Sequence, residues 1–154
     1  MNRFMEAAVE EARVAVTSAH GGPFGAVIVY DGKIVARAHN TVLLDNDPTA
    51  HAEMNAIREA ARTLGSYHLS DCDIYTSCEP CPMCYAAIYW ARLGRIFHGA
   101  TRADAAAIGF DDDAIYRDLA DPKGERDVPL TRLDREECLE PFRLWESTPN
   151  RVTY

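Results

Sequence analysis

The sequence predicts an α/β domain in which helices pack on a mixed β-sheet. Three observations support this prediction: a β-hairpin pattern over residues 24–40, an alternation of helix and strand patterns after residue 50, and a balanced composition. Hydrophobic residues make up 47% of the chain and charged residues 26%, as in ordinary globular proteins. Because 154 residues suit one domain with a sizeable core, we expect a single domain over residues 1–154.

The first half of the chain predicts a helix, a hairpin and a second helix. Residues 2–19 place Glu and Arg among apolar residues at helical spacing, which indicates an amphipathic helix rather than a signal peptide. Two runs rich in Val and Ile follow over residues 24–40. They are joined by Asp31-Gly32, a pair that tolerates the positive φ of a two-residue turn. A loop then leads to a helix over residues 50–65, ended by Gly65.

The next segment predicts a strand, a helix and another strand. Residues 72–77 have the composition of a short strand. Pro80 is expected to open the helix that continues over residues 81–94, since the missing N–H of proline would have no partner in a first helical turn. Residues 95–101 predict the following strand.

The C-terminal third has a weaker pattern. Residues 104–129 predict a mixture of short helix and loop, and residues 134–148 predict a helix in which Pro141 is the weak point. The remaining tail ends with "PNRVTY". The alternation of strands and helices before this region favours one mixed sheet covered by helices.

Charge and cysteine content narrow the possible functions. The formal net charge is −8, and lysine occurs only at positions 33 and 123, so the clustered basic face typical of nucleic-acid binding is not expected. No apolar stretch reaches the roughly 20 residues of a membrane-spanning helix. The amphipathic helix predicted at the N-terminus, in place of a signal peptide, predicts a cytoplasmic protein. In that compartment five cysteines are not expected to form a disulfide framework, and closely spaced cysteines indicate a metal site.

The segment "TSCEPCPMC", residues 76–84, contains two overlapping Cys-x-x-Cys pairs. Cys81 and Cys84 lie three apart at a predicted helix start, so both sulfur atoms can face one point. A helix N-terminus also lowers thiol pKa values and favours the thiolates that zinc requires. Cys78 precedes Pro80 in an extended run and does not share this geometry.

A second helix start contains "HAE", in which His51 and Glu53 point about 200° apart around the helix axis. Both can address one centre only if that centre lies off the helix end. Together with Cys81 and Cys84 they form the H-x-E…P-C-x-x-C pattern of zinc deaminases. Three protein ligands would leave water as the fourth, with Glu53 to move its proton. The alternative is a closed structural site with Cys78 as fourth ligand.

The chain resembles the cytidine deaminase-like zinc hydrolases and, more closely, the small bacterial guanine deaminases. The resemblance rests on "GGPFGAVIV", "NDPTAHAE", "YTSCEPCPMC", "AIYWAR" and "GFDDDAIY", in that order. It implies a three-layer α-β-α sandwich with a five-stranded mixed sheet. It also implies one Zn²⁺ per chain, held by His51, Cys81 and Cys84 with water or hydroxide as fourth ligand. Glu53 would be the proton shuttle in the hydrolysis of guanine to xanthine and ammonia.

The same resemblance implies four substrate contacts. Asn40 would hydrogen-bond the purine, Phe24 would pack beside it, Asp112 would engage its ring and amino group during catalysis, and Tyr154 would close the site. Because residues 111–113 are all Asp, the role assigned to Asp112 could belong to a neighbour. Each of these residues also has an interpretation without a substrate. Asn40 could form a turn at the end of a strand and Phe24 could belong to the core. Asp112 could belong to a solvated run of aspartates, and Tyr154 could be a frayed chain end.

The resemblance further implies a homodimer in which the segment of about residues 130–154 is exchanged and Tyr154 completes the partner's site. The expected substrate is a small purine, in purine catabolism, with no nucleic-acid or membrane partner. Deamination of guanosine, another aminopurine or an aminotriazine remains an alternative. Two further alternatives are a deaminase that acts on adenosine in transfer RNA and a non-catalytic binding module stabilised by zinc.

Overall fold

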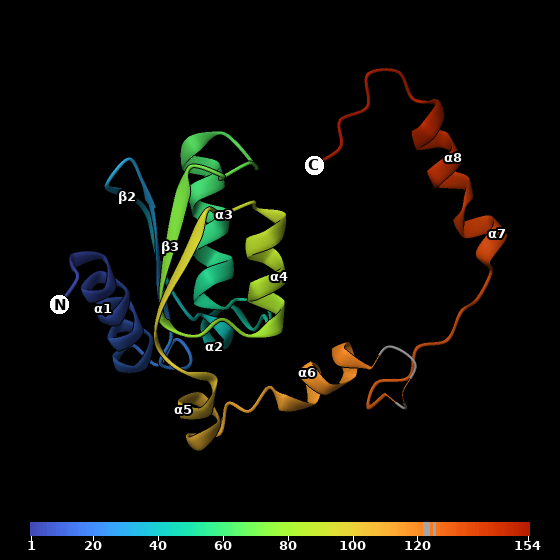
Figure 1. Ribbon diagram of the computed structural model, residues 1–154. Coiled ribbons are helices and arrows are strands. Elements are labelled where there is room, and N and C mark those ends of the chain that lie inside the picture. Colours follow the sequence, from blue (N-terminus) through green and yellow to red (C-terminus); the bar gives the residue numbers. More distant parts are fainter. Residues whose placement is uncertain (122–123, 125) are drawn as a thin grey trace. The chain divides into compact units, whose positions relative to one another are not determined.

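The computed structural model describes residues 1–121, 124 and 126–154. They form two compact units, 1–113 and 114–154, each described here by itself. The first unit holds a sheet with helices on both faces (Figure 1). Its elements in chain order are α1 (Arg3–Thr17), β1 (Gly25–Tyr30), β2 (Lys33–His39), α2 (Val42–Asp45), α3 (Ala52–Leu64), β3 (Cys72–Cys78), α4 (Pro82–Trp90), β4 (Arg95–Ala100) and α5 (Arg102–Ala107).

The sheet has the strand order β2-β1-β3-β4. β1 pairs antiparallel with β2 and β3, whereas β3 and β4 are parallel, so the predicted mixed sheet is confirmed. The predicted hairpin is also confirmed, because Asp31 and Gly32 connect β1 to β2 with φ values of 47° and 68°.

The five-stranded sheet implied by the resemblance is wrong for the described residues, which form four strands. The chain leaves the sheet after β4 because Thr101 begins a helix instead of continuing the extended run. The Thr101 side chain accepts a hydrogen bond from the Asp104 N–H, and the Asp104 carboxylate accepts one from the Thr101 N–H. This reciprocal capping box fixes the start of α5, so the extended run of β4 ends at Ala100.

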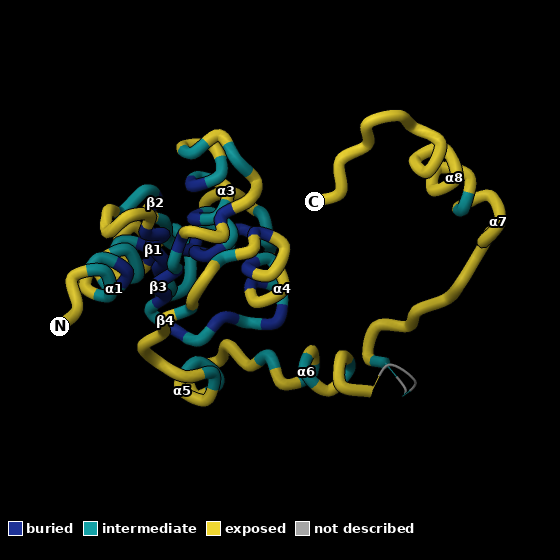
Figure 2. Tube along the Cα trace, turned by 45° about the horizontal axis from the view of Figure 1, so that its top comes forward, coloured by how far each residue is buried: buried dark blue, intermediate teal, exposed yellow. Residues whose placement is uncertain are grey.

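Helices cover the two faces of the sheet differently. α3 and α4 lie on one face and α1 lies on the other, which gives the three layers seen in Figure 1. A stripe of small residues on α3, Ala52, Ala56 and Ala60, is fully buried and packs with Ile28 and Ile74. The central strands β1 and β3 are consequently made up mostly of buried residues, drawn in dark blue in Figure 2.

α1 approaches β1 closely because position 25 has no side chain. A Cβ atom added to Gly25 would lie 2.1 Å from the Ala8 carbonyl oxygen and 2.4 Å from the Ala12 nitrogen. The glycine therefore lets the helix backbone lie directly against the strand.

Two details around the helix starts differ from the sequence predictions. The loop expected over residues 41–49 contains the short helix α2. The helix expected to open at Pro80 instead has Cys81 as its N-cap and Pro82 in its first turn, so that prediction is wrong by two residues. Proline suits the first turn for the reason given above, and Pro82 rather than Pro80 occupies it.

The second unit contains α7 (Arg135–Cys138) and α8 (Glu140–Ser147), and α6 (Asp113–Ala120) begins at its boundary. The single helix predicted over residues 134–148 is interrupted at Leu139, because Pro141 has no N–H to continue the helical bonds. The mixture of helix and loop predicted over residues 104–129 is found in α5 and α6, while residues 122, 123 and 125 lie outside the described residues. Among the described helices, none has the length and apolarity to cross a membrane.

Candidate metal centre and substrate site

Two helix starts bring together the three predicted metal ligands. His51 is the N-cap of α3, Cys81 is the N-cap of α4, and Cys84 lies in the first turn of α4. The His51 Nδ1 atom lies 3.6 Å from Cys81 Sγ and 3.5 Å from Cys84 Sγ. All three potential ligand atoms are within 4.8 Å of one another.

These separations suit a zinc ion. Tetrahedral zinc binds histidine nitrogen at about 2.1 Å and thiolate sulfur at about 2.3 Å, which requires an N···S separation of about 3.6 Å. The two measured N···S distances of 3.5 and 3.6 Å meet this requirement. One imidazole and two thiols are also the donor set of zinc deaminases. The residues present therefore fit the metal.

The two thiols of this group have opposite protonation tendencies. The hydrogen bond from Cys84 and the one from His51 lower the pKa of Cys81 to about 4. The hydrogen bond to Cys81, together with burial, raises the pKa of Cys84. The contact with Cys81 also raises the pKa of His51. Cys81 is thus the shared hydrogen-bond partner of His51 and Cys84, the two groups that would bind a cation together with it.

Cys78 is close to this group but lies outside it. Its Sγ donates to the Thr101 carbonyl oxygen at 3.5 Å, and burial raises the pKa of the thiol to about 11. Among the described residues, the group whose potential ligand atoms all lie within 4.8 Å of one another consists of His51, Cys81 and Cys84, without Cys78. The geometry therefore favours the open three-ligand arrangement over a closed four-ligand site.

Glu53 lies in the first turn of α3, two residues after His51, with only 7% of its surface exposed. Burial raises the pKa of its carboxyl, and the charge of Cys81 raises it further. Carboxyl groups with raised pKa values can exchange protons near neutral pH, which suits a proton carrier beside a metal centre.

Asn40 is 4% exposed and holds the end of β2 against the segment after α1. Its side-chain oxygen accepts hydrogen bonds from Gly22 N at 3.3 Å and Val42 N at 3.2 Å. The oxygen of the Asn40 side chain therefore stabilises a turn at the end of β2. The NH₂ group of the same amide can donate a hydrogen bond to a ligand. A Cβ atom added to Gly21 would lie 2.0 Å from this oxygen, so glycine is required there.

Phe24 packs on the core cluster between the sheet and α3. Its ring meets that of Phe110 edge-on, with centroids 5.0 Å apart and an interplanar angle of 88°. No role for Phe110 was predicted from the sequence. The signal that could have indicated one is its position in "GFDDD", two positions before Asp112.

Asp112 is the one half-buried member of the run 111–113. Its side chain is 18% exposed, against 59% for Asp113. Burial raises the pKa of Asp112, the Arg102 charge lowers it, and the charge of Cys81 raises it. Its partial burial therefore distinguishes Asp112 from the two exposed aspartates beside it.

Tyr154 belongs to the second unit, where its side chain is 72% exposed. The other predicted substrate contacts, Phe24, Asn40 and Asp112, all belong to the first unit.

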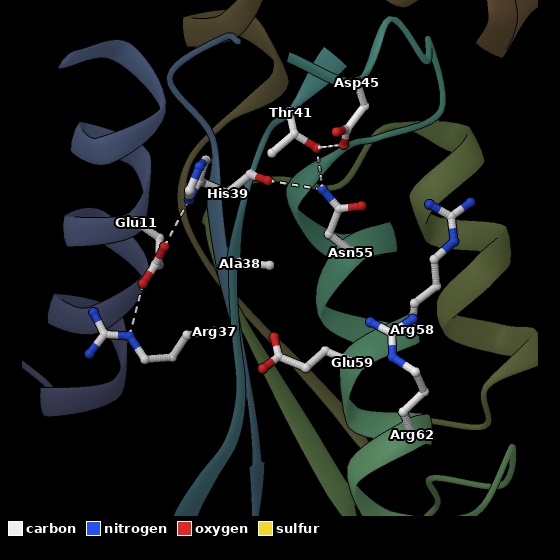
Figure 3. A pocket seen from close by; sticks show the side chains of 10 residues that line it. All are labelled: Glu11, Arg37, Ala38, His39, Thr41, Asp45, Asn55, Arg58, Glu59 and Arg62. Atoms are coloured by element: carbon white, nitrogen blue, oxygen red, sulfur yellow. Dashed lines mark hydrogen bonds and ion pairs between the residues drawn. The ribbon is translucent and has the colours of Figure 1, made fainter. Parts of the chain in front are cut away.

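A separate hollow of about 390 Å³ is lined by residues of α1, β2, α3 and the segment from Thr41 to Asp45 that contains α2 (Figure 3). Glu11 joins two β2 side chains there, with Arg37 Nε at 2.9 Å and His39 Nδ1 at 3.0 Å. Asn55 Nδ2 donates to the His39 carbonyl at 3.1 Å and to Thr41 Oγ1 at 2.9 Å. None of the predicted site residues lines this hollow. Its polar contacts fix the strand end from which Asn40 follows.

Comparison with known proteins agrees with this geometry. The family model for the cytidine and deoxycytidylate deaminase zinc-binding region matches residues 1–100. The guanine deaminase of Bacillus subtilis (strain 168) is 50% identical over 151 residues, which are 98% of this chain and 97% of that protein. A tRNA-specific adenosine deaminase of Agrobacterium fabrum is 45% identical over 105 residues, 68% of each chain.

Structural comparison gives the same result. The X-ray structure of guanine deaminase from Bacillus subtilis superposes with a TM-score of 0.95 at 50% identity, covering 100% of this chain and 99% of that one. The resemblance stated from the sequence motifs is thus confirmed. The chain belongs to the family of the cytidine and deoxycytidylate deaminase zinc-binding region and, within it, to the group that contains the Bacillus subtilis guanine deaminase.

Proposed function

We propose that this chain is a zinc-dependent aminohydrolase that converts guanine and water into xanthine and ammonia. The observation that supports it most is the 50% identity to a guanine deaminase over 98% of this chain and 97% of the relative. A match of this extent includes the C-terminal segment, beyond residues 1–100 of the shared zinc-binding region.

His51, Cys81 and Cys84 would hold one zinc ion per chain. Three protein ligands leave one position of a tetrahedral site open to solvent, as in catalytic rather than structural sites. When bound, zinc supplies Lewis-acid activation of water at neutral pH. Cys84 is buried and Cys81 is partly exposed.

Glu53 would move the protons of the reaction. Guanine carries its leaving amine on C2, between two ring nitrogens. Glu53 accepts a proton from the attacking water, delivers it to the adjacent ring nitrogen, and supports protonation of the departing amine. Its buried position and raised pKa suit both the acceptance and the return of a proton.

Asn40, Asp112 and Phe24 would select and orient the purine. Guanine presents O6 as an acceptor and N1–H with the amino group as donors. The Asn40 amide NH₂ suits the acceptor, and the Asp112 carboxylate suits the donors. Phe24 supplies an apolar surface for the ring, with Phe110 packed against it. A base with the opposite donor pattern would leave these groups unpaired.

The segment of about residues 130–154 is proposed to exchange between the subunits of a homodimer, with Tyr154 completing the partner's site. The proposal is supported by apolar side chains that are exposed in the second unit, among them Phe142, Leu144 and Trp145. Residues 1–154 would then act as one deaminase domain. We place the enzyme in the cytoplasm, where free cysteines such as the five of this chain are usual. The proposed purine substrate places it in purine catabolism.

Deamination of a nucleoside or of transfer RNA is the competing possibility. The net charge of −8 disfavours a phosphate-rich substrate. The experiment is to incubate the zinc-loaded protein with guanine, guanosine, adenine, cytosine and a transfer RNA, and to measure ammonia and product. Xanthine from guanine should form fastest. Faster deamination of guanosine or of the transfer RNA would refute the proposal.

A further inference from the structure

Arg102 is fixed between the metal-binding loop and the aspartate run. Its backbone N–H donates to Glu79 Oε2 at 3.0 Å, and the Glu79 N–H donates to the Ala100 carbonyl at 2.9 Å. Glu79 lies two positions before Cys81 in the chain. The start of α5 is therefore tied directly to the segment that leads into the metal-ligand group.

The backbone around Arg102 is held by further contacts. Thr101 and Asp104 form the capping box of α5, and Cys78 Sγ donates to the Thr101 carbonyl oxygen at 3.5 Å. These bonds fix the backbone from which the Arg102 side chain extends, whichever residue occupies that position.

The Arg102 guanidinium lies between two consecutive carboxylates. Its NH2 nitrogen donates to Asp113 Oδ1 at 3.0 Å, and its Nε atom lies 3.7 Å from Asp112 Oδ1. The shorter contact is a charge-assisted hydrogen bond that fixes the guanidinium. The longer contact is an ion pair beyond hydrogen-bond distance, so Arg102 attracts Asp112 without donating a hydrogen bond at these atoms.

The positive charge of Arg102 stabilises the run of aspartates at 111–113. Three consecutive carboxylates repel one another, and Asp111 already uses an oxygen to accept the Asp113 N–H at 3.0 Å. Asp112 is the half-buried one of the three, so its charge is the least screened by solvent. One fixed guanidinium beside Asp112 and Asp113 offsets this repulsion and restricts where the Asp112 carboxylate can lie.

We propose that Arg102 is a positioning residue that holds the Asp112 carboxylate, through the ion pair and the adjoining Asp113 bond, where it binds the purine. The inference rests on the proposed function, in which Asp112 contacts guanine. Arg102 acts through Asp112, and its main-chain tie to Glu79 couples the substrate-binding carboxylate to the loop that presents Cys81.

The test compares Arg102→Gln with Arg102→Lys in the zinc-loaded full chain. Gln keeps the backbone N–H to Glu79 and removes the charge. We expect kcat/KM for guanine to fall about 10- to 100-fold with a higher KM, since small misplacements of a contacting group have effects of this size. Zinc content and thermal unfolding should not change. Lys restores the charge without the planar fork and should recover part of the loss.

Arg95→Gln is the matched control, because it removes a different arginine–aspartate pair, between the strands β4 and β3, in which Arg95 NH2 lies 2.7 Å from Asp73 Oδ2. This variant should retain wild-type activity. In an Asp112→Asn background, Arg102→Gln should cause no further loss, since the two changes affect one contact.

The outcomes separate the inference from the proposed function. If the wild-type chain does not deaminate guanine, the proposed function fails and the inference with it. If the wild type is active and Asp112→Asn is impaired, an unaffected Arg102→Gln overturns the inference alone. Additive losses in the double variant, or a loss of zinc that parallels the loss of activity, would also overturn it.

Discussion

His51 and Cys81 occupy the same position, the N-cap, in two different helices, and their side-chain atoms meet at 3.6 Å. They are 30 positions apart in the chain. An N-cap residue lies at the end of its helix with an extended backbone, so its side chain can point beyond the helix. This explains how His51 and Glu53 can serve one centre even though they face apart around the helix axis.

Replacing Glu53 by Gln should preserve the fold and the zinc content but reduce guanine turnover at least ~10²-fold, the usual contribution of a positioned proton carrier. Gln has almost the same size and cannot transfer a proton. Steady-state kinetics on protein of verified zinc content checks this expectation. Substantial residual turnover in the zinc-loaded variant would remove Glu53 from the mechanism.

Asp112→Asn should severely reduce guanine turnover, by about 10²-fold, because an amide nitrogen would face the donors of guanine. Asp111→Asn is the comparison, since its oxygen accepts the Asp113 N–H instead. The measurement is kcat/KM for both variants. A larger loss of kcat/KM in Asp111→Asn than in Asp112→Asn would assign substrate binding to the Asp111 carboxylate.

Deletion of residues 150–154 should lower activity much more than zinc content, because Tyr154 would be missing from the site while the metal ligands remain. Mixing inactive Glu53→Gln chains with inactive tail-deleted chains should restore part of the turnover. One hybrid site would then contain both an intact Glu53 and a tail. No recovery after verified subunit exchange would exclude a site shared between subunits.

Ile74→Ala should destabilise the fold by about 2–5 kcal/mol, the usual effect of such a truncation in a core. Ile74 lies in the central strand β3 and is fully buried. Leu43→Ala is the control, since Leu43 is 72% exposed and its truncation leaves no cavity. Urea unfolding of both variants measures the difference. Equal midpoints would contradict the assigned core.

The sequence predicted those elements whose signals are local. Asp31-Gly32 indicated the hairpin turn, and Gly65 indicated the end of α3. The motif with His51 and the motif with Cys81 and Cys84 indicated the three potential metal ligands. Pro80 was misassigned because two prolines flank Cys81, and local composition does not distinguish which one enters the helix.

Other features depend on contacts between distant positions, which no single segment reveals. Whether β4 has a further neighbour depends on pairing with a segment distant in the chain, which no local pattern reveals; the described residues form a four-stranded sheet. The hydrogen bond from the Arg102 backbone N–H to the Glu79 carboxylate joins residues that are 23 positions apart in the chain. The half-buried state of Asp112 within three identical residues likewise follows only from the folded arrangement.

Zinc titration of the metal-free protein tests the central claim most directly. Wild-type chain, Cys78→Ser and Cys81→Ser are titrated with zinc while bound metal and xanthine formed from guanine are measured. Wild type and Cys78→Ser should bind one zinc per chain, with activity rising in proportion, because the Cys78 thiol contacts the Thr101 carbonyl instead of the metal group. Cys81→Ser should bind little zinc and form little xanthine. Loss of zinc from Cys78→Ser as complete as that from Cys81→Ser, or full xanthine formation without zinc, would contradict the account.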